Sequence, residues 1–262
     1  MIKEDEEFKN ANFVINKILS DNYINIIDKK TIDFLATVII EISKNENVSI
    51  RDFDFVGQGM YSIVYKWGNK VLKIGHKRIM NEIPYHKRIL QPLLRKRVPS
   101  ANGLDDKLFI EVSEYAKPLV TDEDFENNFG TKKEKETEDI VYSIFKELKK
   151  DGIAWIDARG QNLGILTKEN TINMKDQFDA KNETVGYIKE TIKDNDKPLQ
   201  PGELVIIDTD AILTQKDFDE GNYPDYISTF WYHYYNKRYE KELEQEELKK
   251  AKNISEDSDI QR

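Results

Sequence analysis

Three short β-rich segments that follow two helical segments constrain the fold of this 262-residue chain more than any other feature. The segments are DFDFVGQG, SIVYKW and KVLKIG, and Trp67-Gly68-Asn69-Lys70, a sequence typical of a tight hairpin turn, joins the last two. Residues 8–46, which precede them, have the apolar spacing of two helices. This order predicts an α+β protein in which an antiparallel sheet follows an N-terminal helical extension.

The rest of the chain is expected to be mainly helical. A helix is expected around residues 77–95, and LFIEVSEYA after it has the composition of a strand. IVYSIFKELKKDG predicts a helix that ends at Gly152, and residues 225–253 form one long helical pattern with an aromatic front and a charged tail. Two further strand-like runs, NLGILT and ELVIID, are separated by the polar segment 168–202, which we interpret as a surface insertion.

The composition excludes several classes of function. Forty Lys and Arg against 49 Asp and Glu give a net charge of −9, which argues against broad nucleic-acid binding. The basic segment HKRILQPLLRKRVPS is interpreted as a solvated helix face. The absence of cysteine excludes disulfides and thiolate metal sites. The chain has no signal-peptide pattern and no run of 18 apolar residues, so we expect a cytoplasmic protein with no membrane or nucleic-acid partner.

A glycine pair and a lysine mark the predicted sheet. Gly57 and Gly59 lie between two predicted strands, where the backbone N–H groups of a glycine turn are able to face an anion. Lys73 lies in the apolar run Val-Leu-Lys-Ile of the next strand, where an unpaired charge is costly. Phosphate oxygens or a carboxylate are suitable partners, and Glu82 on the helix expected around 77–95 is the nearest candidate. Taken alone, these features also fit an ordinary turn and a solvent-facing lysine.

Two acidic motifs follow in the second half of the chain. Asp157 and Asn162 in WIDARGQN combine a carboxylate, a group that is able to accept a hydroxyl proton, with an amide oxygen, a group that is able to ligate magnesium. Asp208 comes directly after the apolar run Leu-Val-Ile-Ile, and a strand-end aspartate beside phosphates is well placed to hold Mg²⁺. Strand-end aspartates also serve as simple caps or turn formers.

The motifs, in this order and on these expected elements, together resemble the protein-kinase-like superfamily. The glycine loop resembles the G-x-G-x-x-G-x-V loop of kinases, with Ser62 in place of the third glycine and Val64 in place of the valine. Asp157 and Asn162 have the spacing of the H-R-D-x-x-x-x-N catalytic loop. The resemblance covers about residues 53–210 and is to a compact, divergent Ser/Thr protein kinase of bacterial or phage type.

The resemblance implies a role for each matching residue. Lys73 resembles the lysine that pairs the α- and β-phosphates of ATP, and Glu82 resembles its helical partner. Asp157 is implied to be the catalytic base, and Asn162 and Asp208 are implied to be the Mg²⁺ ligands. The residues implied to bind ATP, through the phosphates, the adenine ring or backbone hydrogen bonds to adenine, are Gly57, Gly59, Ser62, Val64, Lys73, Glu114 and Ala116.

The resemblance also implies a bilobal fold. Its parts are an N-terminal helical extension (1–50), an N-lobe with an antiparallel sheet (51–116) and a helical C-lobe (117–262), which includes the insertion 168–202 and a tail, 253–262, expected to be disordered. Only 54 residues follow Asp208, and no A-P-E sequence occurs among them. The C-lobe is therefore expected to be reduced, with its activation segment and peptide-docking platform missing or shortened.

The expected function is that of an ATP-dependent phosphotransferase that uses Mg²⁺ and acts on a protein Ser or Thr hydroxyl. One alternative is a pseudokinase or nucleotide-binding regulatory module, because Trp155 and Ile156 replace the His and Arg of the catalytic motif. A second is a small-molecule kinase of the aminoglycoside or sugar type, suggested by Asp210 two residues after Asp208, which should have an acidic pocket built from its C-terminal helices. Nucleotidyl transfer through the same residues is a third, and the sequence leaves the oligomeric state open.

Overall fold

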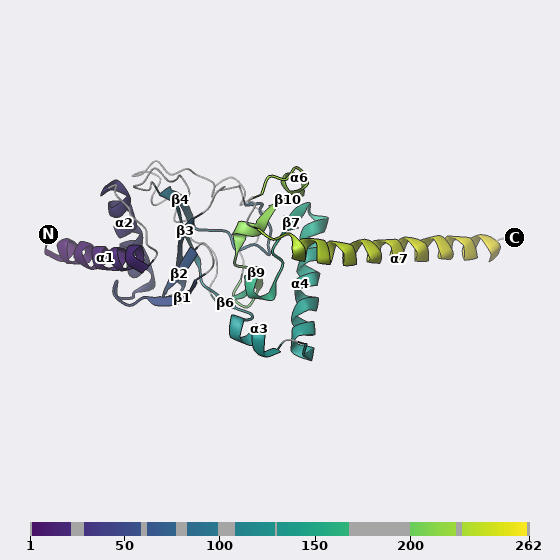
Figure 1. Ribbon diagram of the computed structural model, residues 1–262, viewed down its shortest axis with the longest axis horizontal. Coiled ribbons are helices and arrows are strands. Elements are labelled where there is room, and N and C mark those ends of the chain that lie inside the picture. Colours follow the sequence, from purple (N-terminus) through teal and green to yellow (C-terminus); the bar gives the residue numbers. More distant parts are fainter. Residues whose placement is uncertain are drawn as a thin grey trace. The chain divides into compact units, whose positions relative to one another are not determined.

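The computed structural model describes residues 2–21, 29–58, 62–76, 83–98, 108–128, 130–167, 200–223 and 227–260 (Figure 1). The chain divides into two compact units. Unit 1 comprises Met1–Leu119 with Gly164–Thr209, and unit 2 comprises Val120–Leu163 with Asp210–Arg262. The protein is α+β, with an antiparallel sheet in its N-terminal part followed by helices, as the sequence predicts, and this architecture is compatible with a kinase-like fold.

A five-stranded antiparallel sheet of order β1-β2-β3-β5-β4 is the framework of unit 1. Its strands are β1 (Asp54–Gln58), β2 (Ser62–Trp67), β3 (Lys70–His76), β4 (Leu94–Val98) and β5 (Leu108–Glu114). Strands β2 and β3 form the predicted hairpin, with Gly68 at a φ of 52° in the turn. A positive φ is unfavourable for residues with a Cβ, so glycine suits this position.

Helices α1 (Ile2–Asp21) and α2 (Lys29–Glu46) pack on one face of this sheet. The shared hydrophobic core combines helix side chains with alternate strand side chains, among them Val14, Ile18, Ile39, Ile42, Tyr65, Trp67, Leu72 and Val112. Because successive side chains of a strand point to opposite faces, Val64, Lys73 and Glu111 lie on the face that these helices do not cover. The N-terminal helices therefore stabilise the sheet from the side away from Lys73.

A second, three-stranded sheet belongs to the same unit. Its order is β6-β8-β9, with β6 (Ala116–Pro118), β8 (Leu163–Leu166) and β9 (Leu204–Ile206). At Gly164 an added Cβ would lie 2.8 Å from Ile207 Cγ2 and 3.0 Å from Ala116 Cβ, so only glycine allows β6 and β8 to approach this closely. The polar segment between β8 and β9 lies outside the described residues from 168 to 199.

The helix expected around 77–95 is wrong over its described part. Residues 83–98 contain no helix: a turn at residues 87–88 is followed by strand β4. Pro84 and Pro92 explain the error, because proline lacks the backbone donor of a helix and restricts the residue before it. The solvated helix face expected here is wrong as well, since Arg95 is only 4% exposed on β4.

Unit 2 is mainly helical, with a two-stranded antiparallel sheet. Its elements are α3 (Asp122–Asn128), α4 (Lys132–Lys150), β7 (Ile153–Trp155), β10 (Ile212–Thr214), α6 (Gln215–Asp219) and α7 (Phe230–Ile260). Helix α4 begins after the N-cap Thr131, and Gly152 follows its end at a φ of 73°. The rings of Phe145 on α4 and Tyr235 on α7 lie 5.7 Å apart in the core.

Helix α7 extends further than the sequence analysis expected. It includes residues 253–260, which were expected to belong to a disordered tail. The sequence after Pro224 contains neither glycine nor proline, so no residue with a strong helix-breaking tendency ends α7 earlier. Within the part of the chain that the structure describes, no helix, including the 31-residue α7, is both long enough and apolar enough to cross a membrane.

Candidate functional site

Lys73 and Asp208, which are 135 residues apart in sequence, form an ion pair in unit 1. The Nζ of Lys73 lies 2.9 Å from Oδ1 of Asp208. Lys73 is fixed on β3, and Asp208 follows β9, where the backbone N–H of Ile206 donates to the carbonyl of Arg88 at 2.7 Å. The side chains are 13% and 36% exposed, so this pair of opposite charges is accessible to a solvent-borne ligand.

Lys73 belongs to a row of four aligned residues across the sheet. Val64 pairs with Lys73, Lys73 with Glu111, and Glu111 with Arg95. Residues directly opposite in an antiparallel sheet share a face, so these side chains are neighbours. Arg95 Nε lies 3.2 Å from Glu111 Oε2, and the Thr209 hydroxyl lies 3.5 Å from Glu111 Oε1. Lys73 therefore lies in a row of charges of alternating sign, directly opposite the acidic Glu111.

Glu111 was missed by the sequence analysis, which named Glu82 as the partner of Lys73. A signal was present, because Glu111 is an acid inside the apolar run LFIEVSEYA, just as Lys73 is a base inside its own run. Glu82 and Gly59 lie outside the described residues. Their roles stay predictions.

The described part of the glycine loop lies beside this row. Gly57 is in β1 and pairs with Val64, and Ser62 is the first residue of β2. Gly57 does not have a positive φ, and no atom lies within 4 Å of the position that a Cβ would occupy. The backbone at Gly57 is therefore open on the side that a side chain would fill.

Glu114 and Ala116, the residues implied to contact adenine, lie at adjacent strand ends. The Glu114 side chain is completely buried, and its Oε1 lies 2.6 Å from Lys70 Nζ, which also lies 3.0 Å from Glu46 Oε1 at the end of α2. Ala116 begins β6 and pairs with Leu166 of β8. The buried ion network fixes the end of β5, while the contacts with adenine stay predictions.

Asp157 and Asn162 lie together in unit 2. The Asn162 Nδ2 donates to Asp157 Oδ2 at 2.9 Å and to the Asp157 backbone carbonyl at 2.8 Å. Arg159 Nη2 donates to the same Oδ2 at 2.7 Å. The backbone just before Asp157 is held by the Ile156 N–H, which donates to the Ala211 carbonyl at 2.8 Å. Asp157 is thus an oriented carboxylate, and Arg159 is a contact that the sequence analysis did not identify.

The residues implied to bind magnesium have suitable chemistry. Asp208 offers a carboxylate, and both hydrogen bonds of Asn162 described above use its Nδ2, so neither uses the amide oxygen. Among the described residues, no group of three or more His, Cys, Asp or Glu is arranged to hold a metal. Mg²⁺ commonly needs only one or two protein ligands, because phosphate oxygens and water molecules complete its coordination. Each of the two residues therefore has, by itself, the chemistry of a ligand for this ion.

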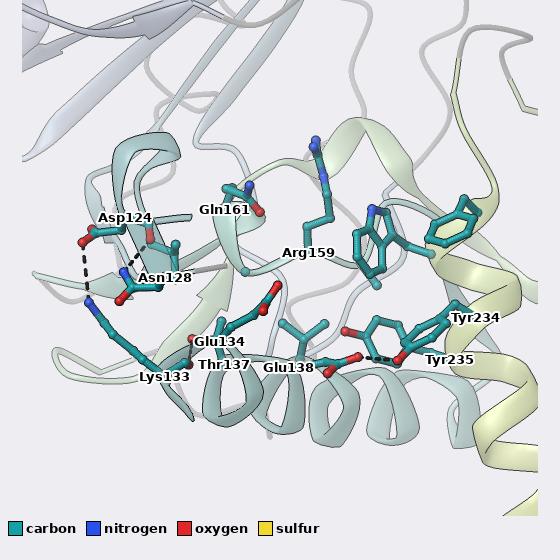
Figure 2. A pocket seen from close by; sticks show the side chains of 16 residues that line it. Asp124, Asn128, Lys133, Glu134, Thr137, Glu138, Arg159, Gln161, Tyr234 and Tyr235 are labelled. Carbon is teal, nitrogen blue, oxygen red and sulfur yellow. Dashed lines mark hydrogen bonds and ion pairs between the residues drawn. The ribbon is translucent and has the colours of Figure 1, made fainter. Parts of the chain in front are cut away.

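A cavity of about 290 Å³ lies within unit 2 (Figure 2). Asp124 and Asn128 of α3 lie at one end, and Tyr234 and Tyr235 of α7 lie at the other. The remaining lining residues come from the segment before α3, from α4, from the loop after Asp157 and from α7: Val120, Lys133, Glu134, Thr137, Glu138, Val141, Ala158, Arg159, Gly160, Gln161, Phe230 and Trp231. The sequence alone predicted no more than an acidic pocket of the C-terminal helices in the case of a small-molecule kinase, and it did not identify this cavity.

One hydrogen bond of this cavity joins α7 to α4. The Tyr234 hydroxyl donates to Glu138 Oε1 at 2.6 Å. This bond to a carboxylate is the main reason why the pKa of Tyr234 is raised. The Tyr234 hydroxyl therefore stays protonated near neutral pH and keeps donating to Glu138.

Comparisons with known proteins include a distant structural likeness. No protein-family model matches the chain, and no curated protein sequence matches it significantly. Among solved structures, the crystal structure of Rad53 1–466 in complex with AMP-PNP matches with 22% identity and a TM-score of 0.30. The match covers 51% of this chain and 39% of that chain, so it spans less than half of the Rad53 structure. A likeness this weak assigns neither a family nor a function, which have to be argued from the side chains.

Proposed function

We propose that this protein binds ATP with Mg²⁺ and transfers the γ-phosphate to a hydroxyl group, with a protein Ser or Thr as the expected acceptor. The observation that carries the proposal is the ion pair between Lys73 and Asp208. A lysine neutralises phosphate oxygens and an aspartate ligates a divalent cation, so the two side chains together supply both requirements of a metal-bound triphosphate.

Unit 1 would provide the nucleotide contacts. Lys73 would bind phosphate oxygens, and Glu111, opposite it on β5, would keep its ammonium group in place. The open backbone at Gly57 would allow the loop to approach the phosphates. Asp208 and Asn162 would hold Mg²⁺, which supplies charge neutralisation to the phosphoryl group.

Asp157 would act on the acceptor. The acceptor oxygen forms a bond to the γ-phosphorus while the bond from that phosphorus to the bridging oxygen breaks, which leaves ADP. The hydroxyl proton passes to the Asp157 carboxylate. Asn162 and Arg159 both donate to Oδ2 of Asp157, so they would orient the carboxylate and leave Oδ1 outside these two bonds.

A small-molecule acceptor is the second candidate, and the cavity of unit 2 favours it. That alternative calls for an acidic pocket that includes C-terminal helices, and this cavity combines Glu134 and Glu138 of α4 with aromatic residues of α7. The pseudokinase, nucleotidyl transfer, the bilobal arrangement and the cytoplasmic location stay predictions.

The test is phosphate transfer from γ-labelled ATP to a broad set of peptide and small-molecule acceptors. We expect transfer by the wild type, its loss in Asp208→Ala and Asp157→Asn, and no change in Asp33→Ala, which alters an exposed residue of α2. Nucleotide binding without transfer would favour the pseudokinase, and a product that carries AMP would favour nucleotidyl transfer. Full activity of Asp208→Ala would refute the assignment of Asp208.

A further inference from the structure

The cavity of unit 2 has the size and walls of a small ligand site. Its volume of about 290 Å³ is close to the lower limit of roughly 300 Å³ for ligand pockets. Phe230, Trp231, Tyr234 and Tyr235 contribute aromatic walls from α7. Phe230 is 61% exposed, although an aromatic side chain of this size gains from burial. The aromatic end is therefore suited to cover part of a ligand.

The floor of the cavity is acidic. Glu134 and Glu138 are four residues apart on α4, which places both carboxylates on the same face of the helix. Two like charges at this spacing destabilise a helix slightly, so their presence has a small cost in the absence of a cation. Their described hydrogen-bond partners are neutral: Glu134 accepts from the Gly130 N–H at 2.5 Å, and Glu138 accepts from the Tyr234 hydroxyl.

The two cations that line the cavity pair with other acids. Lys133 Nζ lies 3.5 Å from Asp124 Oδ1, and Arg159 is paired with Asp157. Figure 2 shows Lys133 directed toward Asp124 at the end of the cavity away from the tyrosines. The negative charges of Glu134 and Glu138 are therefore not matched by these two cations.

We infer that this cavity binds an organic cation, an ammonium or guanidinium group on a partly apolar body. Carboxylates attract the charge, and the faces of Trp231 and the tyrosines stabilise a desolvated cation through their π electrons. Such a group is present in free amino alcohols and in the basic side chains of a polypeptide. The shared chemistry is the organic cation, and the experiment distinguishes the two sources.

The position of the cavity connects it with the acceptor. Ala158, Arg159, Gly160 and Gln161 line the cavity and occupy the sequence between Asp157 and Asn162. Arg159 lines the cavity and also donates to the Asp157 carboxylate. Cation binding here would therefore select the acceptor and orient it relative to Asp157, a role that rests on the proposed phosphotransfer. The binding itself does not depend on that reaction.

The first experiment measures binding to the full chain by calorimetry without nucleotide. The probes are choline, its uncharged analogue 3,3-dimethyl-1-butanol, agmatine, and a serine-containing peptide with one arginine. We expect the cations to bind about ten-fold or more tightly than the uncharged analogue, from the combined charge and cation–π contributions. Tighter binding of choline identifies a free amino alcohol as the source, and tighter binding of agmatine and the peptide identifies a basic side chain.

Variants locate the site. Glu138→Gln and Glu134→Gln should each weaken cation binding several-fold, whereas Glu136→Gln, which alters an exposed acid of the same helix, should not. Circular dichroism confirms that each variant keeps its fold. The inference is overturned if no cation binds, if the uncharged analogue binds equally well, or if all three variants behave alike. Cation binding without phosphate transfer would leave the inference intact and contradict only the proposed function.

Discussion

Replacing Lys70 with Met should strongly destabilise unit 1. Lys70 is completely buried between Glu46 and Glu114, at 3.0 and 2.6 Å, and those side chains are 4% and 0% exposed. Met keeps much of the side-chain volume but removes the positive charge that compensates two buried carboxylates. Removal of one partner of a buried ion pair typically costs about 3–5 kcal/mol. The exposed pair of Lys44 and Glu7, at 3.4 Å, provides a matched comparison, for which Lys44→Met should cost about 0–1 kcal/mol.

Urea unfolding followed by circular dichroism measures both free energies. Because Lys70→Met removes a cation that pairs with Glu46, the double variant Lys70→Met with Glu46→Gln should recover part of the loss, which a double-mutant cycle quantifies. For a protein of this size, each kcal/mol lowers the melting temperature by about 2–4 °C. If Lys70→Met cost no more than Lys44→Met, the buried network between α2, β3 and β5 would be refuted.

Three further predictions follow from single side chains. Gly57→Ala should leave the melting temperature within about 1 °C of the wild type, since the position of the added Cβ is open and the φ of Gly57 is not positive. The same substitution should raise the KM for ATP, and an unchanged KM would show that the loop does not bind the nucleotide. Glu111→Gln should lower stability by about 3–5 kcal/mol, because it removes the carboxylate that pairs with the buried Arg95, and it should weaken ATP binding. Urea unfolding and an ATP titration measure the two effects, and a neutral result would contradict the aligned row. Lys146 holds the pKa of Glu242 below its usual 4.5, so the stability that this pair contributes is present above pH 4.5 and is lost as the pH falls through the lower folded-state pKa. Glu242→Gln should therefore flatten this acidic part of the profile of melting temperature against pH, and an unaltered profile would exclude the pair.

Local sequence patterns were sufficient to predict several of the helices and strands. The hairpin of β2 and β3 follows from two alternating segments and a glycine turn, and α4 follows from its apolar spacing and Gly152. The helix expected around 77–95 failed because apolar spacing was given more weight than Pro84 and Pro92. Proline is the stronger local signal, since it removes a donor whatever the surrounding pattern.

The contacts between distant residues could be predicted only in part. Lys73 was expected to have an anionic partner, but its pairing with Asp208 depends on how β9 lies against the rest of unit 1, which local patterns do not determine. Glu111 and Arg95 are neighbours because β4 and β5 pair in one particular register. A shift of one residue would place them on opposite faces, and composition does not specify that register. The cavity of unit 2 likewise depends on packing between helices far apart in the sequence.

Calorimetric titration with ATP, in the presence and absence of Mg²⁺, tests the central claim most directly. We predict that the wild type binds Mg-ATP, that Lys73→Met weakens binding of ATP under both conditions, and that Asp208→Asn removes the benefit of Mg²⁺ while metal-free ATP still binds. Lys44→Met should bind as the wild type does. If the wild type did not bind Mg-ATP, or if Lys73→Met and Asp208→Asn bound it unchanged, the paired side chains would not form a nucleotide site.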